Sequence, residues 1–93
     1  MRVAHAVLFH LNAQSTMLPY HDREGDPSIH GFLDDAAFIR IFFRDGSVFE
    51  YGVTEIGASQ LMNLRHLARM GDGLPQYLHR YELRKLGRMV PKA

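Results

Sequence analysis

The stretch Phe38–Val53, FIRIFFRDGSVFEYGV, decides the fold of this chain. At its centre stands Asp45-Gly46, a dipeptide favoured in tight hairpin turns because both central residues of a type I′ turn need a positive φ. Runs rich in Phe, Ile, Val and Tyr flank the dipeptide on both sides, and such residues suit a pleated surface. The stretch therefore predicts an antiparallel hairpin.

The length of the turn sets which side chains share a face. A two-residue turn pairs Arg44 with Ser47, and residues directly opposite each other lie on the same face. One face then holds Ile39, Ile41, Phe43, Val48, Glu50 and Gly52. The other holds Phe38, Arg40, Phe42, Phe49, Tyr51 and Val53. Both faces are then apolar, so we expect a helix, the N-terminal segment or another molecule to cover the second one. A three-residue loop would shift this pairing.

Two helices are predicted after the hairpin. Thr54 is a favoured N-cap, and a broad apolar stripe continues to Met70, after which Gly71 suits the C′ position. Pro75 suits the first turn of a second helix. The apolar spacing of that helix comes from Leu74, Leu78 and Tyr81.

The remaining segments complete a small α+β domain. Residues 2–11 alternate in a pattern typical of a strand, residues 12–27 are polar and predict a long loop, and residues 28–32 predict a short strand. We therefore predict an antiparallel sheet, built from the hairpin 37–53 and the strand 2–11, with helices near 55–70 and 75–86 packed on it. The face with Ile39, Ile41, Phe43 and Val48 is predicted to pack on Ile56, Leu64 and Leu67.

Length and composition favour one domain. The 93 residues, 46% of them hydrophobic, are enough for a single modest core. We divide the chain into residues 1–27, a core at 28–86 and an irregular basic tail at 87–93. No apolar run approaches the length of a membrane span, so we expect no membrane partner. The absence of Cys fits a reducing compartment, and we expect a cytoplasmic protein.

The net charge of +1 hides a split along the chain. Residues 1–59 carry four Arg against eight Asp and Glu, whereas residues 60–93 carry seven Lys and Arg against two acids. A cationic element joined to a mildly acidic body favours a nucleic-acid or acidic-protein partner, although a solvated helix face is as common a cause.

One family resemblance covers Ser28 to Leu86. The hairpin contains Phe43-Arg44-Asp45-Gly46 followed by Phe49-Glu50-Tyr51, and the chain ends with the basic run from His79-Arg80-Tyr81 to Leu86. These segments resemble the Phe-x-x-Gly turn, the Tyr-x-Tyr strand and the basic end of the KTSC family. Members of this family are small domains found alone in bacterial and phage proteins and at the C-terminus of some lysyl-tRNA synthetases. Phe49 departs from the pattern by replacing the first Tyr. The resemblance implies the order strand, hairpin, helix and short helix, and it suggests RNA binding.

Motifs for catalysis and metal binding are weak. Five residues could offer metal ligands, but none has a paired-ligand spacing on a helix: His21, Asp22, Glu24, Asp26 and His30. The chain contains no nucleophile elbow, Cys–His pair or phosphate-binding P-loop. We therefore expect a protein that is not an enzyme and that uses no cofactor, metal or small-molecule substrate.

Binding to nucleic acid has more support. Exposed cations neutralise phosphates, and the candidates are Arg65, Arg69, Arg80, Arg84, Lys85 and Arg88. Aromatic side chains on a sheet can stack on unpaired bases, and Phe49 and Tyr51 with Arg40 would form that surface. Aromatics at strand spacing are more often core residues, and Arg40 would then only extend from beneath them to solvent. We predict a non-enzymatic module that binds RNA or a nucleoprotein complex.

A protein-binding module is the alternative. A small domain with two apolar sheet faces could form a two-fold homodimer through one of them. By analogy of size and lack of catalytic groups, it could be a phage-encoded inhibitor of a bacterial defence complex, like an anti-CRISPR protein.

Overall fold

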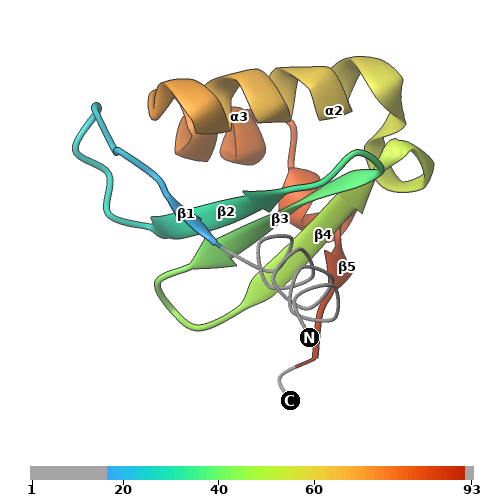
Figure 1. The fold of residues 1–93 in the computed structure, drawn as a ribbon, viewed down its shortest axis with the longest axis horizontal. Coiled ribbons are helices and arrows are strands. Elements are labelled where there is room, and N and C mark those ends of the chain that lie inside the picture. The colour runs from blue at the N-terminus through green and yellow to red at the C-terminus, as the bar shows by residue number, and fades with distance from the viewer. Residues whose placement is uncertain (1–16, 92–93) are drawn as a thin grey trace, which may run out of the picture.

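The computed structural model describes residues 17–91, which form a five-stranded sheet and two α-helices (Figure 1). The elements in chain order are β1 (Leu18–Pro19), β2 (Ile29–Asp34), β3 (Phe38–Phe43), β4 (Val48–Gly52), α2 (Val53–Met70), α3 (Leu74–Arg80), the 3₁₀ turn η1 (Leu83–Lys85) and β5 (Arg88–Met89). The strands are antiparallel and lie side by side in sequence order. The predicted α+β fold is confirmed, while the strand predicted at 2–11 lies outside the described residues.

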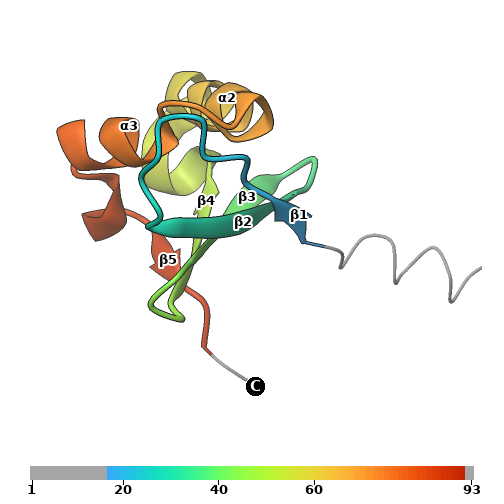
Figure 2. The same cartoon turned by 90° about the vertical axis from the view of Figure 1, so that its left-hand side faces the viewer.

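Both α-helices lie on the same face of the sheet (Figure 2). The sheet therefore has an inner face toward the helices and an outer face on the opposite side. Two of its strands were not predicted from the sequence: β1 lies within the segment expected to be a loop, and β5 lies within the tail expected to be irregular. Each has only two residues, which is too short for a periodic pattern to be visible.

The hairpin has a three-residue loop, so the predicted two-residue turn is wrong. The backbone N–H of Phe43 donates to the carbonyl of Ser47 over 2.9 Å, which leaves residues 44–46 as the loop. Gly46 has φ of 95°, as the last position of such a loop requires. The Asp45 carboxylate stabilises the loop by accepting hydrogen bonds from the backbone N–H and the hydroxyl of Ser47, at 2.9 and 2.6 Å.

The longer loop moves every β4 side chain to the face opposite the predicted one. Tyr51 pairs with Ile39 and Phe49 with Ile41, and all four are buried on the inner face. Val48 and Glu50 lie on the outer face instead, opposite Phe42 and Arg40. The two strands thus alternate between buried and half-buried residues. The predicted assignment of the β4 side chains to the two faces is therefore wrong, and the outer face combines Phe42 and Val48 with Arg40 and Glu50.

The helices follow local signals closely, with three exceptions. Gly71 ends α2 in the left-handed conformation, as predicted, with φ of 71°. The N-cap is Gly52 rather than Thr54, and the Glu55 carboxylate accepts the Gly52 N–H over 2.7 Å. The helix is interrupted after its first turn at Gly57, where φ is 81° and ψ is 162°.

The second helix ends at Arg80, six residues earlier than predicted, because Glu82 adopts a positive φ of 52°.

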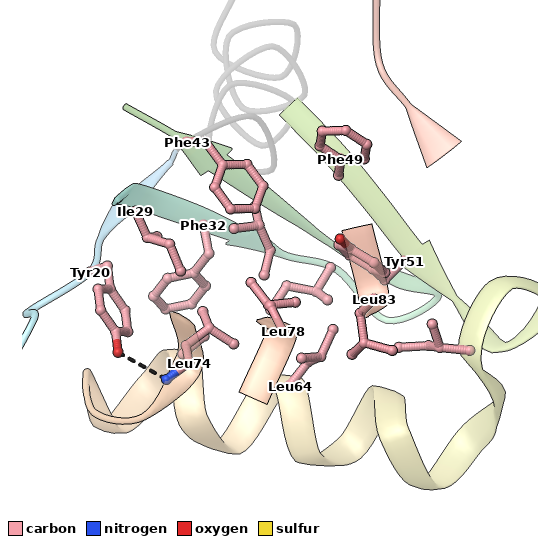
Figure 3. Close-up of a cluster of buried hydrophobic side chains, with 14 of the residues drawn as sticks. Tyr20, Ile29, Phe32, Phe43, Phe49, Tyr51, Leu64, Leu74, Leu78 and Leu83 are labelled. Carbon is pink, nitrogen blue, oxygen red and sulfur yellow. Dashed lines mark hydrogen bonds between the residues drawn. The ribbon is translucent and has the colours of Figure 1, made fainter. Parts of the chain in front are cut away.

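The core fills the space between the inner face and the helices (Figure 3). Ile39, Ile41 and Phe43 belong to one cluster with Ile56 and Leu64, and the partly buried Leu67 packs against it. This packing was predicted, except that Val48 takes no part. Tyr81, which was expected in the apolar stripe of α3, is 49% exposed. Leu83 of η1 is buried in that cluster instead.

Candidate nucleic-acid interface

An open groove of about 720 Å³ runs along α3 and η1, beside the hairpin loop. We call it the α3–η1 groove. Its buried lining residues are apolar: Phe43, Pro75 and Leu78. Its polar lining residues are Asp26, Ser28, His79, Arg80, Glu82, Arg84 and Lys85. Three of the predicted binding cations therefore meet in one concave surface with an apolar floor.

Arg84 packs against the hairpin. Its guanidinium carbon lies 4.0 Å from the centroid of the Phe43 ring and 5.0 Å from that of Phe49. The guanidinium also donates to the hydroxyl of Ser47 over 2.9 Å and lies 3.5 Å from the carboxylate of Asp45. Hydrogen bonds from Ser47, with a further contribution from Arg84, lower the pKa of the Asp45 carboxyl. The Arg84 side chain is nonetheless 46% exposed.

Arg80 and Lys85 stand on the rim of the groove. Lys85 pairs with Glu82 over 3.0 Å. Within residues 17–91, no carboxylate lies within ion-pairing distance of Arg80. Its guanidinium lies 5.7 Å from the centroid of the exposed Tyr81 ring, which in turn contacts the ring of Tyr77. Arg80 is therefore the cation with the most free donors at this site.

Arg65 and Arg69 join α2 to the β2–β3 turn. The Nε of Arg65 donates to Asp34 over 2.8 Å, and its terminal nitrogen donates to the carbonyl oxygen of Ala36 over 2.9 Å. Arg69 donates to the other carboxylate oxygen of Asp34. These contacts stabilise the fold, and the single carboxylate of Asp34 offsets one of the two positive charges. Neither arginine lines the α3–η1 groove, so we leave both out of the candidate interface.

Arg40 and Arg88 lie on the outer face, away from the groove. Both bind the carboxylate of Glu50, at 2.9 and 2.6 Å, and so link β3, β4 and β5. Burial alone would raise the pKa of Glu50, but the hydrogen bonds from Arg88 and Arg40 outweigh it and lower the pKa. The basic C-terminal third is thus divided among three separate surfaces.

The aromatic surface predicted for base stacking does not exist in this form. Phe49 is 8% exposed and Tyr51 is fully buried, because the hairpin register turns both toward the helices. Only Arg40 of that trio is accessible, beside the half-buried Phe38 and Phe42.

Sequence reasoning missed the contributions of Phe43, His79 and Tyr81. The Arg80-Tyr81 dipeptide within the helix predicted near 75–86 was a local signal for the last of these. The contact between Arg84 and Phe43 has no such signal, because it depends on how the chain folds back onto the hairpin loop.

The other predicted features bear on what the site can bind. Within residues 17–91, no group of three or more His, Asp or Glu could hold a metal ion. None of the described helices is long and apolar enough to cross a membrane. The homodimer remains a prediction, and the outer face with the half-buried Phe38, Phe42 and Val48 is its candidate surface. Light scattering at micromolar concentration would test it.

Comparison with known proteins finds no match to this chain. No family model, no curated protein and no solved structure matches this chain. The resemblance to the KTSC family therefore stays a prediction, and the function must be argued from the groove itself.

Proposed function

We propose that this protein is a non-enzymatic module that binds RNA, free or within a nucleoprotein complex, through the α3–η1 groove. The observation that carries the proposal is the meeting of Arg80, Arg84 and Lys85 along one groove with an apolar floor. Cations of this kind neutralise phosphates, while apolar and aromatic surfaces accept sugars and bases. The RNA binding suggested for the KTSC family agrees with this proposal.

The charge balance of the groove predicts how strong the binding is. Asp26 and Glu82 also line it, so the three cations face two carboxylates. Repulsion from these carboxylates reduces the affinity for a phosphate chain. We therefore expect a modest affinity, within the range of about 10⁻⁴ to 10⁻⁶ M that is typical of non-specific contacts at physiological salt.

Salt dependence is the test. Fluorescence polarisation with a labelled single-stranded RNA of mixed sequence should give an affinity that falls as salt rises. Each phosphate contact with a single strand contributes about 0.7 to the slope of log K against log salt. The double variant Arg80→Gln/Lys85→Gln should weaken binding and make the slope shallower by about 1.4, since it removes two phosphate contacts.

A matched variant separates the groove from overall charge. Arg23→Gln/Arg69→Gln also removes two exposed cations, and neither residue lines the groove. Its slope and affinity should stay close to those of the wild type. If both double variants lose binding equally, the contact is a diffuse charge effect and the groove is not the site.

Failure to bind RNA at low salt would favour the protein-binding alternative. The same groove would then accept an acidic segment of a partner protein, as an inhibitor of the anti-CRISPR kind could do. A pull-down from bacterial lysate, with defence nucleoprotein complexes as the first suspects, would then identify the partner. Loss of the captured partner with Arg80→Gln/Lys85→Gln would assign the contact to the groove.

A further inference from the structure

We propose that the α3–η1 groove selects single-stranded nucleic acid by stacking one unpaired base on the guanidinium plane of Arg84. This inference rests on the proposed function and adds a specificity to it. It starts from a feature that phosphate binding does not require, namely that Arg84 packs over the Phe43 ring and donates to Ser47 within the chain itself.

Arg84 is fixed on one face and along one edge. The ring of Phe43 lies under the guanidinium at 4.0 Å, and the ring of Phe49 meets Phe43 edge to face, with centroids 5.8 Å apart (Figure 3 shows the two rings). Ser47 and Asp45 hold the edge of the plane at 2.9 and 3.5 Å. These contacts already restrict the Arg84 side chain, so a ligand that binds to it costs less of that side chain's entropy.

We expect Arg84 to bind a ligand by stacking of its guanidinium plane rather than by charge attraction to a phosphate. The carboxylate of Asp45 offsets that charge, and an ion pair reduces attraction to a phosphate. The Arg84 side chain remains 46% exposed although the Phe43 ring lies 4.0 Å from its guanidinium carbon, and Arg84 lines the groove. Bases of single strands stack on arginine planes as they do on aromatic rings.

The neighbouring residues suit the rest of a nucleotide chain. Arg80 and Lys85 line the same groove and can reach the flanking phosphates, and Pro75 and Leu78 form an apolar floor for the base edge and the sugar. A base within a duplex has both faces covered by its neighbours, so it cannot stack on Arg84 without being extruded. The arrangement therefore favours a single strand over a duplex.

The test compares three RNA ligands of equal length at one low salt concentration. They are a single-stranded oligoadenylate, an abasic ribose-phosphate oligomer and a duplex. The wild type should bind the oligoadenylate about tenfold more tightly than the abasic oligomer, since one stacked base contributes about that factor. It should also bind the oligoadenylate more tightly than the duplex. This wild-type comparison does not depend on how any variant folds.

Two lysine variants then test whether Arg84 causes the preference for oligoadenylate over the abasic oligomer. Arg84→Lys keeps the charge but removes the plane, so the preference for oligoadenylate over the abasic oligomer should fall to nearly one while abasic binding persists. Arg80→Lys is the matched control and should keep the preference, because a phosphate contact needs only charge. Thermal melting confirms that both variants fold.

The results distinguish base stacking on Arg84 from RNA binding by the α3–η1 groove. Equal wild-type binding of the base-bearing and abasic oligomers, tighter binding of the duplex, or an unchanged preference in Arg84→Lys would overturn base stacking and leave RNA binding by the groove intact. Absence of binding to all three ligands would overturn the proposed function and this inference together.

Discussion

Gly87 lies directly against the ring of Tyr51. A Cβ atom added at Gly87 would come within 2.7 Å of two ring carbons and 3.0 Å of the hydroxyl. The ring cannot move aside, because Tyr51 is fully buried in the core. This contact lets the chain pass from η1 into β5 over the end of the hairpin.

We therefore expect Gly87→Ala to destabilise the protein by about 1–3 kcal/mol through overpacking. Urea denaturation measures the change. In a Tyr51→Leu background the ring is gone, so the added cost of Gly87→Ala should be much smaller. An equal cost in both backgrounds would show that the ring is not the cause.

The two buried tyrosines should respond in opposite ways to loss of their hydroxyl. The Tyr51 hydroxyl has no hydrogen-bond partner among the described residues, so Tyr51→Phe should leave stability unchanged or raise it by up to about 1 kcal/mol. The Tyr20 hydroxyl donates to Glu24 over 2.7 Å and accepts the N–H of Leu74 over 3.1 Å. Tyr20→Phe should therefore cost about 1–3 kcal/mol. Chemical denaturation of the two variants tests the contrast.

Alkaline pH should destabilise the fold. Burial raises the pKa of the Tyr51 phenol from 10.0 to about 12. Because the folded state then holds the proton more tightly than the unfolded state, this stability is fully present below pH 10 and falls as pH rises from about 10 toward 12. Urea midpoints measured across this range should decline, and the decline should be shallower in Tyr51→Phe. Burial also raises the pKa of Tyr20, so that variant should retain part of the decline.

Alanine substitutions test the hairpin register. Ile41 and Phe49 face the helices, so Ile41→Ala should cost about 2–5 kcal/mol and Phe49→Ala about 3–5 kcal/mol. Val48 is half-buried on the outer face, so Val48→Ala should cost at most about 1 kcal/mol. The two-residue turn predicts the reverse order for Val48 and Phe49. Equilibrium unfolding of the three variants distinguishes the registers.

The sequence by itself determined the features that depend on neighbouring residues. The helix over 55–70, its end at Gly71 and the start of the next helix around Pro75 follow from apolar spacing and from backbone preferences within a few residues. The existence of the hairpin follows in the same way from Asp45-Gly46 between two β-favouring runs.

Tertiary structure decided the register and the composition of the candidate site. Asp45-Gly46 is compatible with loops of two or three residues, and only packing against the helices places Phe49 and Tyr51 inside. The division of the basic third depends on partners far away in the chain, such as Asp34, 31 residues before Arg65, and Ser47, 37 residues before Arg84. No local pattern encodes such distances, because a cation looks the same in the sequence whether its partner is a carboxylate, an aromatic ring or solvent.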